Sequence, residues 1–361
     1  MAKARRKKAQ YKFGIELPRD VNHAHELDKV NGNSLWREAI NEEMGKLHDL
    51  DVFKFLPKGK EPPKDHTRIK LWIIFDVKMG SLRRKARLVA GGHMTAPPSS
   101  ITYSSVASKE SVRLTFLLAK LNKMKLIAVD VTNAYVNAIC REKIAAVAGP
   151  EFGDTQGRWL TLHKALYGLK SSGAAWHAHL CTTLRELGFT PSCGDRDLWL
   201  RPQRKDDGTE YYEYICAYVD DLIIASHNPE RVKAELEESG YLLKGGEEPK
   251  NFLGASLGKH TFQDGDVTWY QSAEEYLTNA IGAVEAKIGM KLEGGKKKHV
   301  TPLDHTYRPE VDQTPLLDED RATYYQSLVG ILLWAVELGR IDIAQETTTM
   351  ARFTNLPREG H

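Results

Sequence analysis

The chain has 361 residues, of which 41% are hydrophobic and 27% charged, and its formal net charge is +3. This length and composition are typical of a globular protein that buries a substantial core and divides into two or three subdomains. No apolar run approaches the roughly 20 residues that cross a bilayer, and the basic start lacks the apolar core of a secretory signal. The four cysteines have no paired spacing. We therefore expect an intracellular, reduced protein rather than a membrane protein, a disulfide scaffold or a zinc ribbon.

Residues 1–33 are polar and poorly patterned, and we expect them to form a flexible basic arm. The arm opens with a block that holds no acid, so that the rest of the chain carries a net charge of −3. Its basic residues are Lys3, Arg5, Arg6, Lys7, Lys8 and Lys12. Such a block binds phosphate backbones, acts as a nuclear import signal, or is simply a solvated tail, and these readings stay open.

Helices and strands then follow without a regular βαβ alternation, which predicts an α+β fold. A helix begins after Ser34, which is placed to cap it, because apolar residues recur at helical spacing as far as Leu47. The other predicted helices cover residues 111–124, 168–187, 229–239 and most of the chain after Gln271, apart from a loop at 293–318. The predicted strands cover residues 69–75, 86–90, 126–131 and 252–257, with a hairpin that carries Asp220 and Asp221 at its tip.

Three acids interrupt apolar, strand-like runs. Asp220 and Asp221 stand between residues 215–217 and 222–225, and Asp130 lies in a run of its own 90 residues upstream. Charges are costly in buried strands, and a divalent cation offsets a carboxylate cluster that would otherwise repel itself. Asp is also common in tight turns, so an ordinary hairpin turn is the alternative for the pair alone. The third acid, on a separate strand, favours a metal site.

Five motifs in a fixed order carry a family resemblance. They are KARLVA at 85–90, DVTNAY at 130–135, LYGLK at 166–170 with Trp176 behind it, YVDD at 218–221 and FLG at 252–254, and residues 325–330 and 340–343 extend them. With these motifs the chain resembles the reverse transcriptase of copia-type long-terminal-repeat retrotransposons over roughly residues 34–361. Asp76, Gly173, Ala174 and residues 339–342 depart from the usual pattern of that family.

The resemblance implies a right-hand polymerase with fingers, palm and thumb, in which an antiparallel palm sheet packs on helices. Residues 34–250 would form the fingers and palm, and residues 251–361 the primer-holding strand and a helical thumb or connection region. The implied activity is RNA-directed DNA synthesis, in which deoxynucleotides are added to a primer 3′-end by two-metal phosphoryl transfer.

The resemblance also assigns site residues. The catalytic acids would be Asp130, Asp220 and Asp221, and these with Val131 would hold two Mg²⁺ ions, or Mn²⁺ in their place. The nucleotide would be bound by Arg87, Lys85, Lys78, Tyr135, Gly168 and Lys170, and the primer by Phe252, Leu253 and Gly254. Tyr135 would select deoxynucleotides by excluding a 2′-hydroxyl, whereas periodicity alone favours a core aromatic on a strand or turn. Arg suits triphosphate binding because its planar fork meets phosphate oxygens bidentately.

The partners implied are an RNA or DNA template with its primer and deoxynucleoside triphosphates, with no membrane. The ribonuclease H and integrase modules of a parent polyprotein are not expected in this chain. A cytoplasmic location, in a retroelement particle, is implied, with the nucleus as the alternative. One competing interpretation is a catalytically inactive nucleic-acid-binding remnant, for which the departures at Asp76 and Gly173 argue. Another is a different palm polymerase, such as an RNA-copying viral enzyme.

Overall fold

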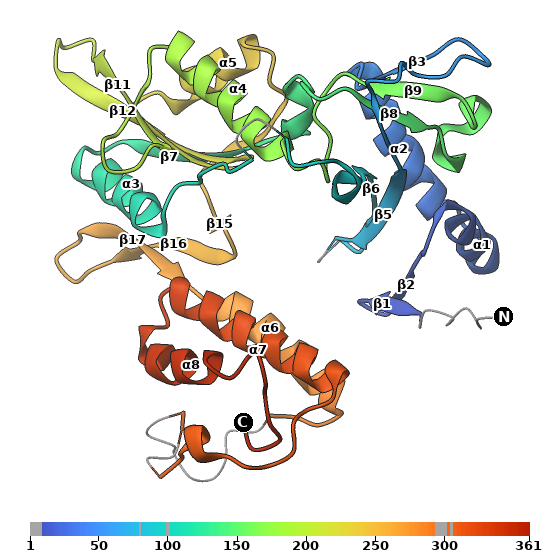
Figure 1. The fold of residues 1–361 in the computed structure, drawn as a ribbon. Coiled ribbons are helices and arrows are strands. Elements are labelled where there is room, and N and C mark those ends of the chain that lie inside the picture. The colour runs from blue at the N-terminus through green and yellow to red at the C-terminus, as the bar shows by residue number, and fades with distance from the viewer. Residues whose placement is uncertain (1–8, 79–80, 99–101, 293–301, 304–305) are drawn as a thin grey trace. The chain divides into compact units, whose positions relative to one another are not determined.

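The computed structural model describes residues 9–78, 81–98, 102–292, 302–303 and 306–361 and divides into two units. The first unit contains Met1–Ala107, Val129–Leu222 and Glu230–Lys244, and the second contains Ser108–Ala128, Ile223–Pro229 and Gly245–His361. Helices and sheets are mixed in the chain without a regular βαβ alternation (Figure 1), which confirms the α+β prediction. None of the helices in the described ranges is long and apolar enough to cross a membrane.

Asp130 and Asp221 lie in a six-stranded sheet, and Asp220 lies in the turn before Asp221. Its strand order is β10 (Thr190–Pro191), β11 (Leu198–Arg204), β12 (Glu210–Tyr218), β13 (Asp221–Ser226), β7 (Lys125–Val131) and β14 (Leu243–Glu247). Helices α4 (Ser172–Glu186) and α5 (Pro229–Glu238) cover one face of β11 and β12 (Figure 1). Trp176, Leu180 and Leu184 of α4, which recur at helical spacing, are buried. The predicted β12–β13 hairpin and the predicted helix at 229–239 are both present.

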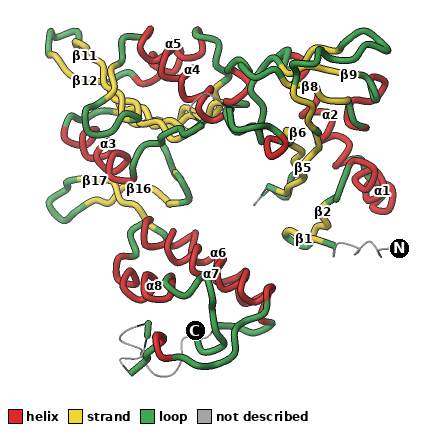
Figure 2. The backbone as a smooth tube through the Cα atoms, in the orientation of Figure 1, coloured by secondary structure: helices red, strands yellow, loops and turns green. Residues whose placement is uncertain are grey.

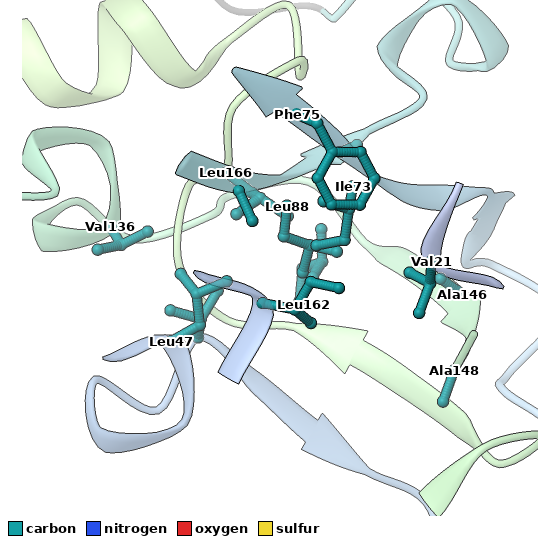
Figure 3. Packing of buried hydrophobic residues seen from close by; sticks show 14 of the residues in the cluster. Val21, Leu47, Ile73, Phe75, Leu88, Val136, Ala146, Ala148, Leu162 and Leu166 are labelled. Carbon is teal, nitrogen blue, oxygen red and sulfur yellow. The ribbon is translucent and has the colours of Figure 1, made fainter. Parts of the chain in front are cut away.

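A second hydrophobic core lies under helix α2 (Leu35–Asp49). It is built on the hairpin β5 (Leu71–Val77) and β6 (Arg84–Ala90) and on a four-stranded sheet of order β3 (Phe53–Phe55), β9 (Trp159–Leu162), β8 (Ile144–Val147) and β4 (Thr67–Ile69). Figure 3 shows Ile73 and Phe75 of β5 packed with Leu88 of β6 and Leu162 of β9. Strand β5 therefore buries alternate residues, while Trp72, Ile74 and Asp76 between them are left outside this core.

The expectation of a flexible arm over residues 1–33 is wrong for residues 10–31. These form the hairpin β1 (Gln10–Lys12) and β2 (Ile15–Leu17) and the helix α1 (Val21–Asn31). Helix α1 is mostly polar, and only Val21, Ala24 and Asp28 are buried, so its hydropathy pattern is too weak to predict. The basic block from Lys3 to Lys8 lies outside the described residues.

Asp28, and not the predicted Ser34, caps the start of helix α2. Its buried carboxylate accepts hydrogen bonds from the backbone N–H groups of Trp36 (3.0 Å) and Arg37 (2.9 Å) at the start of α2. Ser34 makes no capping hydrogen bond to the backbone, and its hydroxyl donates to the Glu38 carboxylate instead. An acid from the preceding helix thus satisfies the free N–H groups and complements the helix dipole.

The second unit holds helix α3 (Lys109–Leu121), a three-stranded sheet and three further helices. The sheet has the order β15 (Asn251–Phe252), β16 (Ala255–Thr261) and β17 (Val267–Ser272), and the helices are α6 (Glu274–Ile288), α7 (Glu319–Glu337) and α8 (Ala344–Ala351), seen in red in Figure 2. The predicted strand at 252–257 is wrong: Leu253 (φ 50°) and Gly254 (φ 84°) form a turn between β15 and β16.

Helix α3 belongs with the second unit, whose last segment begins at Gly245. The aromatic ring of Phe116 in α3 packs edge-on against Trp269 of β17, with ring centroids 5.2 Å apart. Arg113 of α3 donates to the carbonyl oxygen of Glu337 at 2.7 Å. Such long-range contacts cannot be seen in local patterns.

His177 of α4 is expected to make stability depend on pH. Its Nε2 lies 2.6 Å from Oδ1 of the buried Asp197, and this hydrogen bond, with a smaller effect of Cys181, raises the pKa of His177 to about 10. Because the folded-state pKa exceeds the unfolded value near 6.5, this stabilisation is complete below about pH 6.5 and is lost as the pH rises through 10. We expect His177→Gln to lose about 1–3 kcal/mol at pH 6 and to flatten that decline.

Urea unfolding at pH 6, 8 and 10 measures the effect, with the exposed His25 changed to Gln as the control. Equal pH slopes in the wild type and His177→Gln would contradict the assignment.

Candidate active site

The structure brings the three predicted acids to adjacent strands. Asp130 lies near the end of β7, Asp220 in the turn after β12, and Asp221 is the first residue of β13, which pairs with β7. The backbone N–H of Val131 donates to the carbonyl oxygen of Asp220 at 2.8 Å, which ties the two strands together at the acids. All three acids are half-buried.

The acids destabilise one another's charge. Burial, followed by the charges of Asp220 and Asp130, raises the pKa of Asp221 to about 6. Burial and the Asp130 charge also raise the pKa of Asp220, although Arg87 and Lys85 oppose this. The site therefore concentrates negative charge that nearby cations only partly offset, which is the condition under which a bound cation is favoured.

Trp176 fixes the turn that presents the pair. Val219 occupies the left-handed region (φ 57°), which is rare for a β-branched residue. Its carbonyl oxygen accepts a hydrogen bond of 2.7 Å from the indole N–H of the buried Trp176. The sequence identifies Trp176 only as part of a motif and of a helix face, whereas the fold makes it the support of the Asp220 turn.

A metal centre is not preassembled here. Over the described residues, no three Asp, Glu, His or Cys side chains gather as a metal ion requires. The donor set nevertheless suits Mg²⁺, which prefers carboxylate oxygens, because Asp130 and Asp220 both line one cavity. The predicted ligand Val131 lines it too, with its side chain buried. Metal binding by these residues remains a prediction.

The cavity beside the acids has a volume of about 670 Å³ and a strongly basic wall. It lies wholly within the first unit. The acidic lining residues are Glu42, Glu43, Asp76, Asp130 and Asp220. The basic lining residues are Lys12, Lys46, Lys78, Arg83, Arg84, Lys85, Arg87 and Lys244. The predicted nucleotide-binding residues Lys78, Lys85 and Arg87 are therefore among them. Basic side chains that line the same cavity as Asp130 and Asp220 fit an anionic ligand bound near a divalent cation.

Arg87 is held by an aromatic stack. Its guanidinium carbon lies 4.0 Å from the centre of the Tyr167 ring, and Tyr167 in turn packs against Tyr135 with ring centroids 4.6 Å apart. Burial raises the pKa of Tyr167 to about 12 and also raises that of Tyr135, so both rings stay neutral at physiological pH. The stack joins the two residues predicted to bind the phosphates and the sugar, and it orients the Arg87 guanidinium.

Gly168 and Lys170 have structural roles in this structure. Lys170 donates to the carbonyl oxygen of Thr95 at 2.7 Å and is not among the cavity-lining residues. Gly168 (φ 94°) lets the segment after Tyr167 approach β6, where the N–H of Ala90 donates to the Tyr167 carbonyl at 2.7 Å. The predicted contact of these two residues with the nucleotide remains a prediction.

Gly168→Ala should be strongly destabilising. A Cβ at this position would lie 2.2 Å from the carbonyl oxygen of Ala90, and its positive φ disfavours any other residue. We expect a loss of about 2–4 kcal/mol, since both backbone strain and a steric clash are involved. Chemical denaturation measures the loss, and Gly45→Ala in α2, where a Cβ meets nothing within 4 Å, is the control. Equal stability of the two variants would refute this role.

The predicted primer-binding residues Phe252, Leu253 and Gly254 lie in the second unit. Phe252 is buried in β15, and the other two residues form the β15–β16 turn. The space above Gly254 is limited, because a Cβ there would lie 3.3 Å from the indole nitrogen of Trp334. Their role toward a primer stays a prediction.

Sequence reasoning missed several residues of the cavity, among them Tyr167, Glu43 and Lys12. Tyr167 belongs to the LYGLK motif and could have been singled out there. Glu43 accepts a hydrogen bond from the backbone N–H of Leu88 at 3.1 Å, and burial raises its pKa. Lys12 was only one of many charges in a basic run, and nothing local distinguishes it.

Comparison with known proteins identifies relatives over most of the chain. A family model described as "Reverse transcriptase (RNA-dependent DNA polymerase)" matches residues 59–280. The putative transposon Ty5-1 protein of Saccharomyces cerevisiae is 33% identical over 239 residues, which cover 64% of this chain and 71% of that protein. The retrovirus-related Pol polyprotein from transposon RE1 of Arabidopsis thaliana is 27% identical, over 90% of this chain but 21% of its own length.

A solved structure of a foamy viral protease–reverse transcriptase in complex with double-stranded DNA aligns with a TM-score of 0.43 and 14% identity, covering 89% of this chain and 48% of that chain. The chain thus spans about a fifth of the RE1 polyprotein and about half of the foamy viral chain.

Proposed function

This chain belongs to the reverse transcriptase family, in the group found in copia-type retrotransposon polyproteins, and on that premise we propose that it synthesises DNA on an RNA template by extending a primer. The observation that carries the proposal is that Asp130 and Asp220 lie on neighbouring segments of the sheet and line the same basic cavity. We further propose that the right-hand arrangement of fingers, palm and thumb applies to this chain.

In the proposed reaction, Asp130, Asp220 and Asp221 would hold two divalent cations at the primer end. When bound, two Mg²⁺ ions lower the pKa of a 3′-hydroxyl and neutralise the charge of the leaving pyrophosphate. The raised pKa of Asp221 implies that protons compete with metal below about pH 6, so metal affinity should fall in that range. The chain itself supplies positioning and charge rather than covalent chemistry.

The basic wall would bind the incoming triphosphate. Arg87, with its guanidinium oriented by the Tyr167 ring, can donate two parallel hydrogen bonds to phosphate oxygens. Lys85 and Lys78 add point charges along the same wall. Burial, followed by the Arg87 charge, lowers the pKa of Lys85. Such a shift is expected where two cations lie close together and no phosphate is bound between them.

Tyr135 would act as the sugar gate, and Tyr135→Ala should relax the choice of sugar. If the ring excludes a 2′-hydroxyl, the ratio of kcat/KM for dTTP over UTP should fall by about 10-fold or more, the scale of a lost steric contact of 1–3 kcal/mol. Tyr135→Phe, which keeps the ring, is the matched control. An unchanged ratio in Tyr135→Ala would mean that the ring only supports Tyr167.

The partners proposed are a primed RNA or DNA template and deoxynucleoside triphosphates, and the location proposed is the cytoplasm, within a retroelement particle. The deciding experiment is primer extension on poly(rA) with an oligo(dT) primer, Mg²⁺ and dTTP, with the Asp220→Asn, Asp221→Asn double variant beside the wild type. Extension by the wild type alone supports the proposal. Template binding without extension by either protein would favour an inactive nucleic-acid-binding remnant.

A further inference from the structure

The N-terminal hairpin contributes a side chain to the basic cavity. Lys12, at the end of β1, lines the cavity, and its Nζ lies 2.5 Å from Oδ1 of Asp76 on β5. The two residues are 64 positions apart in the chain. Both side chains are half-exposed, at 41% and 47%, so the pair lies at the cavity wall and not in the core.

Asp76 is one of three acids, with Glu42 and Glu43, among the basic residues that line this part of the cavity. It lies directly across the β5–β6 hairpin from Lys85. Burial would raise the pKa of Asp76, but hydrogen bonds from Lys12 and from the Val77 N–H outweigh it and lower the pKa. Asp76 therefore stays ionised at neutral pH, and its charge is paired with that of Lys12.

The other two acids, Glu42 and Glu43, have partners other than Lys12. Glu42 is paired with Lys46 of its own helix at 2.5 Å and also with Arg83. Glu43 accepts the hydrogen bond from Leu88. In contrast, the ion pair of Asp76 is made by Lys12, which comes from a separate hairpin. Lys85 also attracts Asp76 across the hairpin, but Lys12 is the cation that is hydrogen-bonded to it. Loss of Lys12 would thus leave the Asp76 carboxylate without its hydrogen-bonded cation, opposing an anionic ligand.

We propose that Lys12 determines nucleotide affinity by neutralising Asp76, so that the β5–β6 wall accepts a triphosphate. Lys12 acts here as a positioning residue for charge and not as a catalytic residue. The inference rests on the proposed function, because it takes a deoxynucleoside triphosphate as the ligand of the cavity. It makes the N-terminal hairpin, which sequence patterning assigns to a flexible arm, a part of the substrate site.

The test is equilibrium binding of dTTP to the full chain with a primed template whose primer ends in a dideoxynucleotide, in Mg²⁺. We expect Lys12→Ala to raise the Kd about tenfold, because an unpaired unit charge a few Å from a triphosphate produces an effect of that order near a protein surface. Asp76→Asn should not weaken binding, and the Lys12→Ala, Asp76→Asn double variant should return to within about twofold of the wild type. The Lys12→Ala effect should also shrink as salt is raised.

Lys29→Ala, an exposed lysine of α1, is the matched control. An exposed ion pair contributes little to stability, so all variants should unfold like the wild type. If Lys12→Ala weakened binding equally with Asp76 or Asn at position 76, Lys12 would contact the ligand directly and the neutralisation proposal would be overturned. An unchanged Kd in Lys12→Ala would overturn it as well. Binding without primer extension by the wild type would refute the proposed function alone, and no dTTP binding would refute both.

Discussion

Asp221→Asn is expected to lower the rate of primer extension by about 10³-fold or more while leaving the protein folded. The magnitude follows because metal ions supply several kcal/mol of transition-state stabilisation, and about 4 kcal/mol corresponds to a factor of 10³. Asn keeps the shape of the side chain and removes the charge. Single-turnover extension of a primed template measures the rate.

Stability separates this loss of function from a structural defect. The folded-state pKa of Asp221, about 6, exceeds the usual value of 3.8, so its charge destabilises the folded metal-free protein. This cost grows as the pH rises from about 3.8 to about 6 and is complete above that range. Asp221→Asn should therefore be at least as stable as the wild type at pH 7 in the presence of a chelator. Asp206→Asn in an exposed loop is the control. Retention of a tenth or more of the wild-type rate in Asp221→Asn would remove Asp221 from the proposed catalytic set.

Glu213→Ala is expected to cause the largest loss of stability among the variants considered. Glu213 of β12 is fully buried, and its carboxylate accepts hydrogen bonds from Arg201 of β11 (2.8 Å) and Arg231 of α5 (2.7 Å). Arg201 also pairs with Glu235 at 2.7 Å and lies over the Phe189 ring. Removing the central carboxylate leaves the largely buried Arg201 guanidinium without its main partner, which costs about 3–5 kcal/mol.

Urea unfolding of Glu213→Ala measures this loss. The matched control is Glu210→Ala on the same strand, whose ion pair with Arg204 is exposed and should contribute about 1 kcal/mol or less. Because Glu213 is not among the residues that line the cavity, Glu213→Ala should reduce the fraction of folded protein rather than the rate of the chemical step. The extension rate per folded molecule should stay within a few-fold of the wild type. A loss of less than 1 kcal/mol would show that the network does not stabilise the fold.

Local patterns predicted those elements whose burial is regular. The helix after Ser34, the helix at 229–239 and the hairpin before Asp221 all carry apolar residues at the period of the element. The turn at Leu253 was missed because an apolar residue with positive φ breaks what reads as a continuous strand. The first helix was missed because its order comes from three buried residues and from the cap that Asp28 makes to the next helix.

The sequence by itself determined the family, the three acids and the basic motif around Arg87, because each is a local pattern of residue types at fixed spacing. Only the tertiary structure decided which groups meet: Lys12 with Asp76, Arg87 with the Tyr167–Tyr135 stack, Trp176 with the Asp220 turn, and Gly168 with Ala90. Each of these contacts joins segments that are far apart in the chain. Their formation depends on which faces are buried together when the sheets and helices pack, and periodicity within one element carries no information about its partner.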